Sequence, residues 1–210
     1  MEEPVTFPPN AFLKMDEEDD AVFYLPPRFV THIDDPAIAA LGEFYCKTLP
    51  AGGVLLDLMS SWVSHLPETV SYREVIGLGM NEAELAKNPR LTRHFVQDLN
   101  KTPTLPLADS SVDAAMICVS IQYLQQPVAV LADVARVLVP GGPLIVSFSN
   151  RCFPTKAVAI WRALGDADHA NLVGIYMRQA GFASIAAHVL KDGSDSDPLI
   201  AVVGRTSSSS

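Results

Sequence analysis

A polar turn that follows an apolar run is the first place in this chain where residue types and spacing suggest chemistry. The run Val54–Leu58 contains one acidic residue, Asp57, and the turn after it contains Met59, Ser60 and Ser61. In open doubly wound sheets, ligands lie at the carboxyl ends of the strands, where a glycine-rich turn lets the main chain approach them. The acidic residue near a strand end therefore predicts a nucleotide-type site, and the missing glycines predict an altered one.

Further candidates for chemistry lie in irregular segments elsewhere in the chain. His32 lies in an aromatic-rich stretch, and its near-neutral pKa suits proton transfer from a substrate oxygen, nitrogen or sulfur, although a capping or surface role is the alternative. Asn150 and Arg151 follow an apolar run, where an amide could orient a nucleophile and a guanidinium could bind an anion. Lys156, on the helix expected next, favours surface solvation over anion binding. Tyr123, which follows another apolar run, is expected to form an aromatic wall.

Hydrophobic periodicity predicts the elements that position these residues. Short apolar runs predict seven strands, and stretches of helical periodicity predict five helices between them. This alternation implies a parallel sheet with right-handed crossovers. The strands are expected at residues 54–58, 74–78, 95–97, 114–119, 144–148, 185–190 and 199–203, and the helices at 36–47, 81–87, 127–139, 154–164 and 171–180.

Three stretches in the middle of the chain carry a resemblance to a known family. They are Asp98-Leu-Asn, Leu105-Pro-Leu-Ala-Asp-Ser-Ser-Val-Asp113 and Arg136-Val-Leu-Val-Pro-Gly-Gly142. With these motifs, residues 41–204 resemble the class I S-adenosylmethionine-dependent methyltransferases. The resemblance implies an α/β, Rossmann-like fold whose mostly parallel seven-stranded sheet has helices on both faces. It also implies S-adenosylmethionine as the cofactor and a small molecule as the methyl acceptor.

The resemblance also assigns cofactor-binding positions after the second and third strands. Asp98 and Leu99 match the adenine-facing pair of the family. Gly79 falls where the family has the acidic residue that accepts hydrogen bonds from the ribose hydroxyls. Asn81 or Glu82, at the start of the next helix, is expected to take over this role, although Asn81 is equally suited to be a helix N-cap.

The turn after the first strand departs most from the family pattern. Asp57 matches the acidic position, whereas Met59 and Ser61 fall where glycines belong. In one interpretation, Ser60 and Ser61 offer hydroxyl and amide donors to the cofactor carboxylate. In the other, the turn packs against the domain and closes the pocket. Ser120, at the tip of the fourth strand, completes the expected cofactor-binding set.

Three functions are compatible with these residues. The first is an active small-molecule methyltransferase. The second is a catalytically inactive methyltransferase-fold protein that acts as a binding or interaction module, which the missing glycines favour. A nicotinamide-dependent oxidoreductase is the weakest, because the Gly-x-Gly-x-x-Gly pattern is absent.

Composition excludes several classes of partner. The 210-residue chain is 49% hydrophobic and 19% charged, with a formal net charge of −9, which indicates one globular domain with a substantial core. The acidic balance argues against nucleic acid, and no signal or membrane-spanning segment is visible, so we expect a cytoplasmic location, or an organellar one after removal of a transit peptide. Cys46, Cys118 and Cys152 lack ligand spacing and are expected to be reduced, mostly buried thiols, with no metal site. The oligomeric state is left open.

The termini differ in composition from the central domain. Residues 1–20 are proline-rich and then acidic and are expected to form a flexible arm, and residues 205–210 are expected to form a disordered tail. Residues 21–204 are expected to form a single methyltransferase-like domain, and within it residues 21–40 are expected to be a lid over the pocket.

Overall fold

A seven-stranded sheet runs through the middle of the protein. The structure is a computed structural model that describes residues 5–208, apart from the side chain of residue 166. The strand order is β3-β2-β1-β4-β5-β7-β6; β1 to β5 are parallel, and β7 runs antiparallel to both β5 and β6. The strands are β1 (Val54–Leu58), β2 (Glu74–Gly79), β3 (Arg93–Val96), β4 (Ala114–Cys118), β5 (Pro143–Phe148), β6 (Ala183–Lys191) and β7 (Leu199–Arg205).

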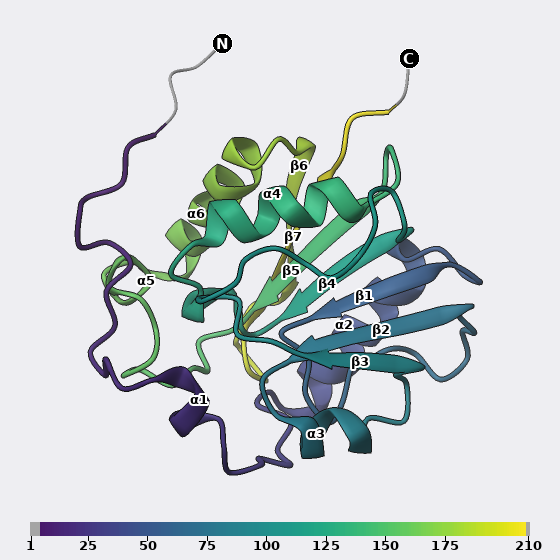
Figure 1. Cartoon of the computed structure of the whole chain (residues 1–210), viewed down its shortest axis with the longest axis horizontal. Helices are drawn as coiled ribbons and strands as arrows, with labels where there is room; N and C mark the ends of the chain where they lie inside the picture. Colours follow the sequence, from purple (N-terminus) through teal and green to yellow (C-terminus); the bar gives the residue numbers. More distant parts are fainter. Residues whose placement is uncertain (1–4, 209–210) are drawn as a thin grey trace.

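Helices cover both faces of the sheet because its central strands are apolar on both sides. Every residue of β1 and β5 is buried, as expected for strands covered on two faces. α2 packs into the core on one face, and α4 and α6 pack on the other (Figure 1). The helices are α1 (Asp20–Phe23), α2 (Asp35–Thr48), α3 (Glu82–Lys87), α4 (Pro127–Val137), α5 (Ala159–Arg162) and α6 (Asp166–Gln179), with a 3-10 turn, η1, at Ile121–Tyr123. The sheet and its order confirm the predicted fold class.

One predicted helix was much too long. Residues 154–164 were expected to be helical, but only α5 (Ala159–Arg162) forms there. The main-chain N–H groups of Ala159 and Ile160 donate to the carbonyls of Leu13 and Ala11, 2.8 Å in each case, and so do not bond back along a helix. The N-terminal segment takes the hydrogen bonds that a longer helix would need.

Residues 5–20, expected to be a flexible arm, lie along α5 and α6 (Figure 1). The rings of Phe7 and Phe12 pack on Tyr176 of α6, with centroids 5.6 and 6.0 Å away. Residues 1–4 of the expected arm are outside the described part of the chain.

The C-terminal end of the domain reaches further than expected. β7 continues to Arg205, and the Thr206 hydroxyl donates to the carbonyl of Val139 at 2.8 Å. Residues 209 and 210 of the expected tail are outside the described residues.

The three cysteines are free thiols. Cys46 is exposed, so the expectation of mostly buried thiols was wrong for this residue. It follows the buried Tyr45 on α2, and one step along a helix turns a side chain away from the buried face. Within residues 5–208, no helix is long and apolar enough to cross a bilayer.

Candidate active site

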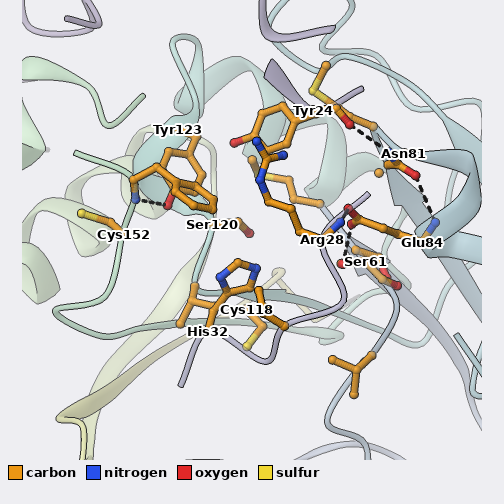
Figure 2. A pocket seen from close by; sticks show the side chains of 18 of the residues that line it. Tyr24, Arg28, His32, Ser61, Asn81, Glu84, Cys118, Ser120, Tyr123 and Cys152 are labelled. Carbon is orange, nitrogen blue, oxygen red and sulfur yellow. Dashed lines mark hydrogen bonds between the residues drawn. The ribbon is translucent and has the colours of Figure 1, made fainter. Parts of the chain in front are cut away.

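A pocket of about 700 Å³ opens at the carboxyl edge of the parallel strands. The segments that follow β1, β2, β3, β4 and β5 line it together with residues 28 and 30–34 of the N-terminal segment, and Figure 2 shows some of these side chains. Its volume lies within the range of about 300–1,000 Å³ typical of small-molecule sites. This edge is where doubly wound sheets bind their ligands.

The structure brings every predicted site residue to this one pocket. The expected catalytic side chains and the expected cofactor-binding residues all line it: His32, Asp57, Met59, Ser60, Ser61, Gly79, Asn81, Asp98, Leu99, Ser120, Tyr123, Asn150 and Arg151. Shared location does not assign their chemistry, which depends on what each side chain contacts.

Backbone strain is concentrated around the pocket. Six non-glycine residues have positive φ angles in the described part of the chain, and four of them line the pocket. These are His32 (67°), Met59 (56°), His65 (53°) and Val119 (44°). A β-branched residue such as Val119 is rarely found in this region. Such strain costs about 1–3 kcal/mol per residue and clusters at functional sites.

Asp57, at the end of β1, is a buried carboxylate without a cationic partner among residues 5–208. Its Oδ2 accepts hydrogen bonds from the hydroxyls of Ser60 and Ser64, each at 2.6 Å. Burial raises the pKa of Asp57 to about 6, and the two hydroxyls offset only part of this effect. A positively charged ligand group would supply the missing partner.

The turn after β1 uses its hydroxyls inside the protein. Ser60 donates to Asp57, and the hydroxyl of Ser61 donates to the carboxylate of Glu84 at 2.6 Å. These contacts are different from the expected ones, in which the hydroxyls of Ser60 and Ser61 bind a cofactor carboxylate. The partners come from β1 and α3, which are packed on either side of the turn.

The same turn lies directly against the end of β2, at Gly79. The Ser60 N–H donates to the carbonyl of Leu78 at 2.8 Å, and a Cβ on Gly79 would lie 2.2 Å from the Ser60 carbonyl oxygen. Any side chain at this position would collide with main chain. The acidic residue that the family has there is therefore excluded sterically, and Gly79 contributes only backbone to the pocket wall.

Asn81 is fully engaged in fixing local structure. Its Oδ1 accepts from the Glu84 N–H at 3.1 Å, which makes it the N-cap of α3, as one of its two interpretations predicted. Its amide donates to the carbonyls of Tyr24 and Leu25, at 2.8 and 3.0 Å. Asn81 thereby fastens the N-terminal segment to the start of α3 (Figure 2).

The acidic side chain that reaches the pocket from α3 is Glu84, which the sequence analysis missed. It is nearly buried and accepts from the Arg28 N–H and from the Ser61 hydroxyl, both at 2.6 Å. Glu82, the expected substitute, instead faces solvent and contacts His94 at 3.0 Å. The helical period could have predicted this difference, because Glu84 lies two positions beyond Glu82 and therefore on a different face of α3.

Asp98 and Leu99 follow β3 as expected. The Asp98 carboxylate accepts from the Asn100 N–H at 2.9 Å and lies 3.8 Å from the ammonium of Lys101. Leu99 is buried in the core and also lines the pocket. Together they offer an acceptor and an apolar surface on the same wall.

The segment after β5 contributes less than expected. Arg151 is 63% exposed, with its Nε 3.7 Å from a carboxylate oxygen of Asp197, and Asn150 is also exposed.

Two predicted residues follow β4. The hydroxyl oxygen of Tyr123 accepts from the Phe153 N–H at 2.8 Å, so this aromatic wall is held in place. Ser120 has a buried hydroxyl with no hydrogen-bond partner in the described residues.

The expectation that Lys156 is a surface residue was wrong. Its side chain is completely buried, and its ammonium donates to the carbonyl of Glu18 at 2.7 Å. It also lies 3.1 Å from Asp16 and 3.4 Å from Asp20. The partners come from the N-terminal segment, about 140 positions away in the chain, and a local pattern cannot predict contacts at this distance.

The N-terminal segment holds His32 over the pocket. Trp62 Nε1 donates to the carbonyl of Val30 at 2.9 Å, and the imidazole of His32 meets the Phe153 ring edge-on with centroids 5.6 Å apart. Burial lowers the pKa of His32; the negative charge of Glu84 opposes this effect, and the positive charge of Arg28 adds to it. His32 is therefore neutral near pH 7 and able to accept a proton.

Comparison with known proteins supports the same fold. Residues 60–146 match a family model described as a methyltransferase domain. No curated protein matches the chain significantly. A SAM-dependent methyltransferase from Archaeoglobus fulgidus is similar in structure, with a TM-score of 0.62 at 10% identity over 80% of this chain and 93% of the other.

Two further solved structures are similar. A SAM-dependent methyltransferase from Thermotoga maritima has a TM-score of 0.57 at 20% identity, over 81% of this chain and 90% of the other. The Haemonchus contortus phosphoethanolamine N-methyltransferase 2, solved in complex with S-adenosyl-L-methionine, has a TM-score of 0.57 at 13% identity, over 81% of this chain and 52% of the other. At these identities the likeness shows the fold alone.

The strand order with its antiparallel β7 is that of the class I methyltransferase fold, which the similar solved structures share. The family model described as a methyltransferase domain covers residues 60–146, less than half of the chain. Neither finding determines a substrate.

Proposed function

We propose that the protein binds S-adenosylmethionine in this pocket and transfers its methyl group to a small molecule. The observation that carries the proposal is the concentration of strained backbone and a buried, cation-free carboxylate in one pocket at the carboxyl edge of the sheet. Strain and an unpaired buried charge both lower stability, and a site that had lost its ligand would gain by relaxing them.

The residues present fit the cofactor, although through a different set from the family pattern. Asp57 and Glu84 supply negative charge that suits the sulfonium and ammonium groups. Leu99 and Asp98 supply an apolar surface and an acceptor for the adenine. Glu84, rather than a residue at position 79, is the carboxylate available on the α3 side for the ribose hydroxyls.

Bound S-adenosylmethionine supplies an electrophilic methyl group. The chain's own part is to position the acceptor, to exclude water and to remove a proton where the acceptor requires it. His32, neutral and facing the pocket, takes this proton. The N-terminal segment, fastened through Asn81 and Trp62, acts as the lid that keeps water out.

The size of the pocket and the charge of the chain favour a small molecule as the acceptor. A site of about 700 Å³ that the N-terminal segment helps to line has the size expected for a small molecule. The net charge of −9 adds a repulsive term against nucleic acid. The free cysteines suit a reducing, cytoplasmic location, which stays a prediction.

Calorimetric titration with S-adenosylmethionine and S-adenosylhomocysteine tests the proposal. We expect micromolar binding of both by the parent, weakened at least tenfold in Asp57→Asn, because the amide removes the negative charge. Binding is also expected to weaken below about pH 6, where Asp57 takes up a proton. No binding of either ligand by the folded parent would reject the proposal.

The second candidate is an inactive methyltransferase-fold module. It is favoured by the inward-bonded turn after β1, whose hydroxyls contact Asp57 and Glu84. A folded parent that binds neither cofactor nor product would make this the leading function. Micromolar cofactor binding without turnover on any screened acceptor would indicate that such a module binds the cofactor as a sensor and does not transfer its methyl group.

A further inference from the structure

Arg28 crosses the pocket from one wall to the other. Its main-chain N–H donates to Glu84 at 2.6 Å, on the α3 side. Its guanidinium carbon lies 4.4 Å from the ring centroid of Phe23, 5.5 Å from that of Phe153 and 5.8 Å from that of Tyr24. Figure 2 shows the side chain starting near Glu84 and ending beside the Tyr24 ring. The charged end thus lies among aromatic rings, on the side of the segment that follows β5.

The guanidinium of Arg28 has no carboxylate partner among the described residues. It donates only to main-chain carbonyls, those of Phe23 at 2.8 Å and Pro26 at 3.4 Å, which leaves further N–H donors free. Arg151, the other arginine that lines the pocket, already has Asp197 beside it. A guanidinium among aromatic rings, with donors to spare, is suited to a planar anion.

Two acidic side chains that line the pocket, Asp20 and Glu84, have partners in the protein other than the Arg28 guanidinium. Asp20 contacts the ammonium groups of Lys14 and Lys156. Glu84 accepts from the Arg28 N–H and the Ser61 hydroxyl. Neither forms an ion pair with the Arg28 guanidinium, which is therefore available to an anionic ligand.

We propose that Arg28 binds the carboxylate of the methyl acceptor, and that the acceptor is a planar aromatic acid. This inference rests on the proposed methyltransferase function. A carboxylate with one negative charge matches a single guanidinium, whereas the neighbouring acidic side chains repel a doubly charged phosphate. Tyr24, Tyr123 and Phe153 line the pocket and provide rings against which a flat ligand packs.

The position of Arg28 also connects the acceptor to His32. The guanidinium is close enough to lower the pKa of the imidazole, and both His32 and Arg28 line the same pocket. An acceptor held by its carboxylate on Arg28 therefore has its remaining polar group within the part of the pocket that His32 faces. This arrangement would select acids that carry a nucleophile on the ring.

Binding of benzoate and of its neutral analogue benzamide to the parent, saturated with S-adenosylhomocysteine, tests the inference by calorimetry. We expect benzoate to bind at least tenfold more tightly than benzamide, since a charge-assisted bidentate contact is made only with the acid. Arg28→Met should reduce this preference to within twofold, and Arg28→Lys should keep part of it. Arg73→Met is the matched control, because Arg73 is 69% exposed and does not line the pocket.

The outcomes separate this inference from the proposed function. Equal binding of benzoate and benzamide to the parent, or an unchanged preference in Arg28→Met, would overturn the acceptor assignment. A tenfold loss of S-adenosylhomocysteine affinity in Arg28→Met, with 5′-methylthioadenosine unaffected, would also overturn it, since Arg28 would then hold the cofactor carboxylate. If the parent fails to bind S-adenosylhomocysteine but shows an Arg28-dependent preference for benzoate without it, the anion site stands and the methyltransferase proposal fails. Thermal unfolding checks that each variant is folded.

Discussion

Two buried carboxylates face the same pocket, and the protein treats their charges in opposite ways. Asp20 is 8% exposed and Asp57 is 3% exposed. Asp20 contacts the ammonium groups of both Lys14 and Lys156 and accepts from the amide of Asn100 at 3.0 Å. Asp57 receives only hydroxyl hydrogen bonds, and burial raises its pKa to about 6. One charge is neutralised by the fold, and the other is left for a ligand.

The difference shows which part of the pocket is structural and which part is available for binding. Lys156 joins residues 16–20 of the N-terminal segment to the segment that precedes α5, so this cluster holds that part of the N-terminal segment to the domain. The turn after β1 offers Asp57 no cation, although burial there is just as deep. Groups whose charge is destabilised by burial are more common at functional sites than elsewhere.

The largest expected effect comes from breaking the neutralised cluster. Lys156→Met leaves Asp16 without a buried cation and Asp20 with Lys14 alone, and removing one partner of a buried pair typically costs about 3–5 kcal/mol. Unfolding in urea measures the loss. Arg73→Met, which breaks an exposed contact with Asp113, is expected to cost at most about 1 kcal/mol. Equal losses in the two variants would show that the Lys156 cluster does not hold residues 16–20 to the domain.

The next effect depends on pH and concerns Asp57. Its pKa is about 6 in the folded protein and close to the ordinary value of 3.8 in the unfolded chain. The folded state therefore binds the proton more tightly, and this residue lowers the free energy of unfolding as pH rises from about 4 to 6. Above pH 6 the cost is fully present, at about 3 kcal/mol for a shift of this size.

Asp57→Asn tests this expectation. The amide cannot ionise, so the variant should gain about 3 kcal/mol relative to the parent between pH 4 and pH 8, measured by urea unfolding at both values. Carboxylates with a lowered pKa, such as Asp16 and Asp133, affect both proteins equally and cancel in the difference. A difference that does not change with pH would mean that Asp57 has an ordinary pKa.

The fold was predictable from the sequence because it depends on local periodicity. The continuous apolar runs of β1, β4 and β5 occur only where a strand is buried on both faces, and the Pro-Gly-Gly turn before β5 marks where α4 ends. Asp57 and Asp98 were found at the pocket because each follows a strand, and the carboxyl ends of parallel strands meet at one edge.

The parts of the site that sequence reasoning missed depend on contacts between distant segments. The partners of Lys156 lie about 140 positions away, and Arg28 meets Glu84 across 56 positions. Such pairs leave no periodic pattern. Glu84 was missed for a different reason: the prediction chose Asn81 and Glu82, at the start of α3, and not the residue of this helix that faces inward.

The smallest of the three effects concerns the glycine that lets the turn after β1 reach Asp57. Gly79→Ala places a Cβ 2.2 Å from the Ser60 carbonyl oxygen, so the turn has to move, at a cost of about 2 kcal/mol. Moving Ser60 also removes one of the two hydroxyls that stabilise the ionised Asp57, so the pKa of Asp57 should rise further. The difference in the free energy of unfolding between Gly79→Ala and Asp57→Asn would then keep changing with pH up to a higher pH than the difference between the parent and Asp57→Asn.

Gly174→Ala in α6 is the control, because its Cβ meets nothing nearer than 3.6 Å and alanine favours a helix by up to about 1 kcal/mol. A Gly79→Ala protein as stable as the parent, with the same pH dependence, would show that the turn does not tune Asp57.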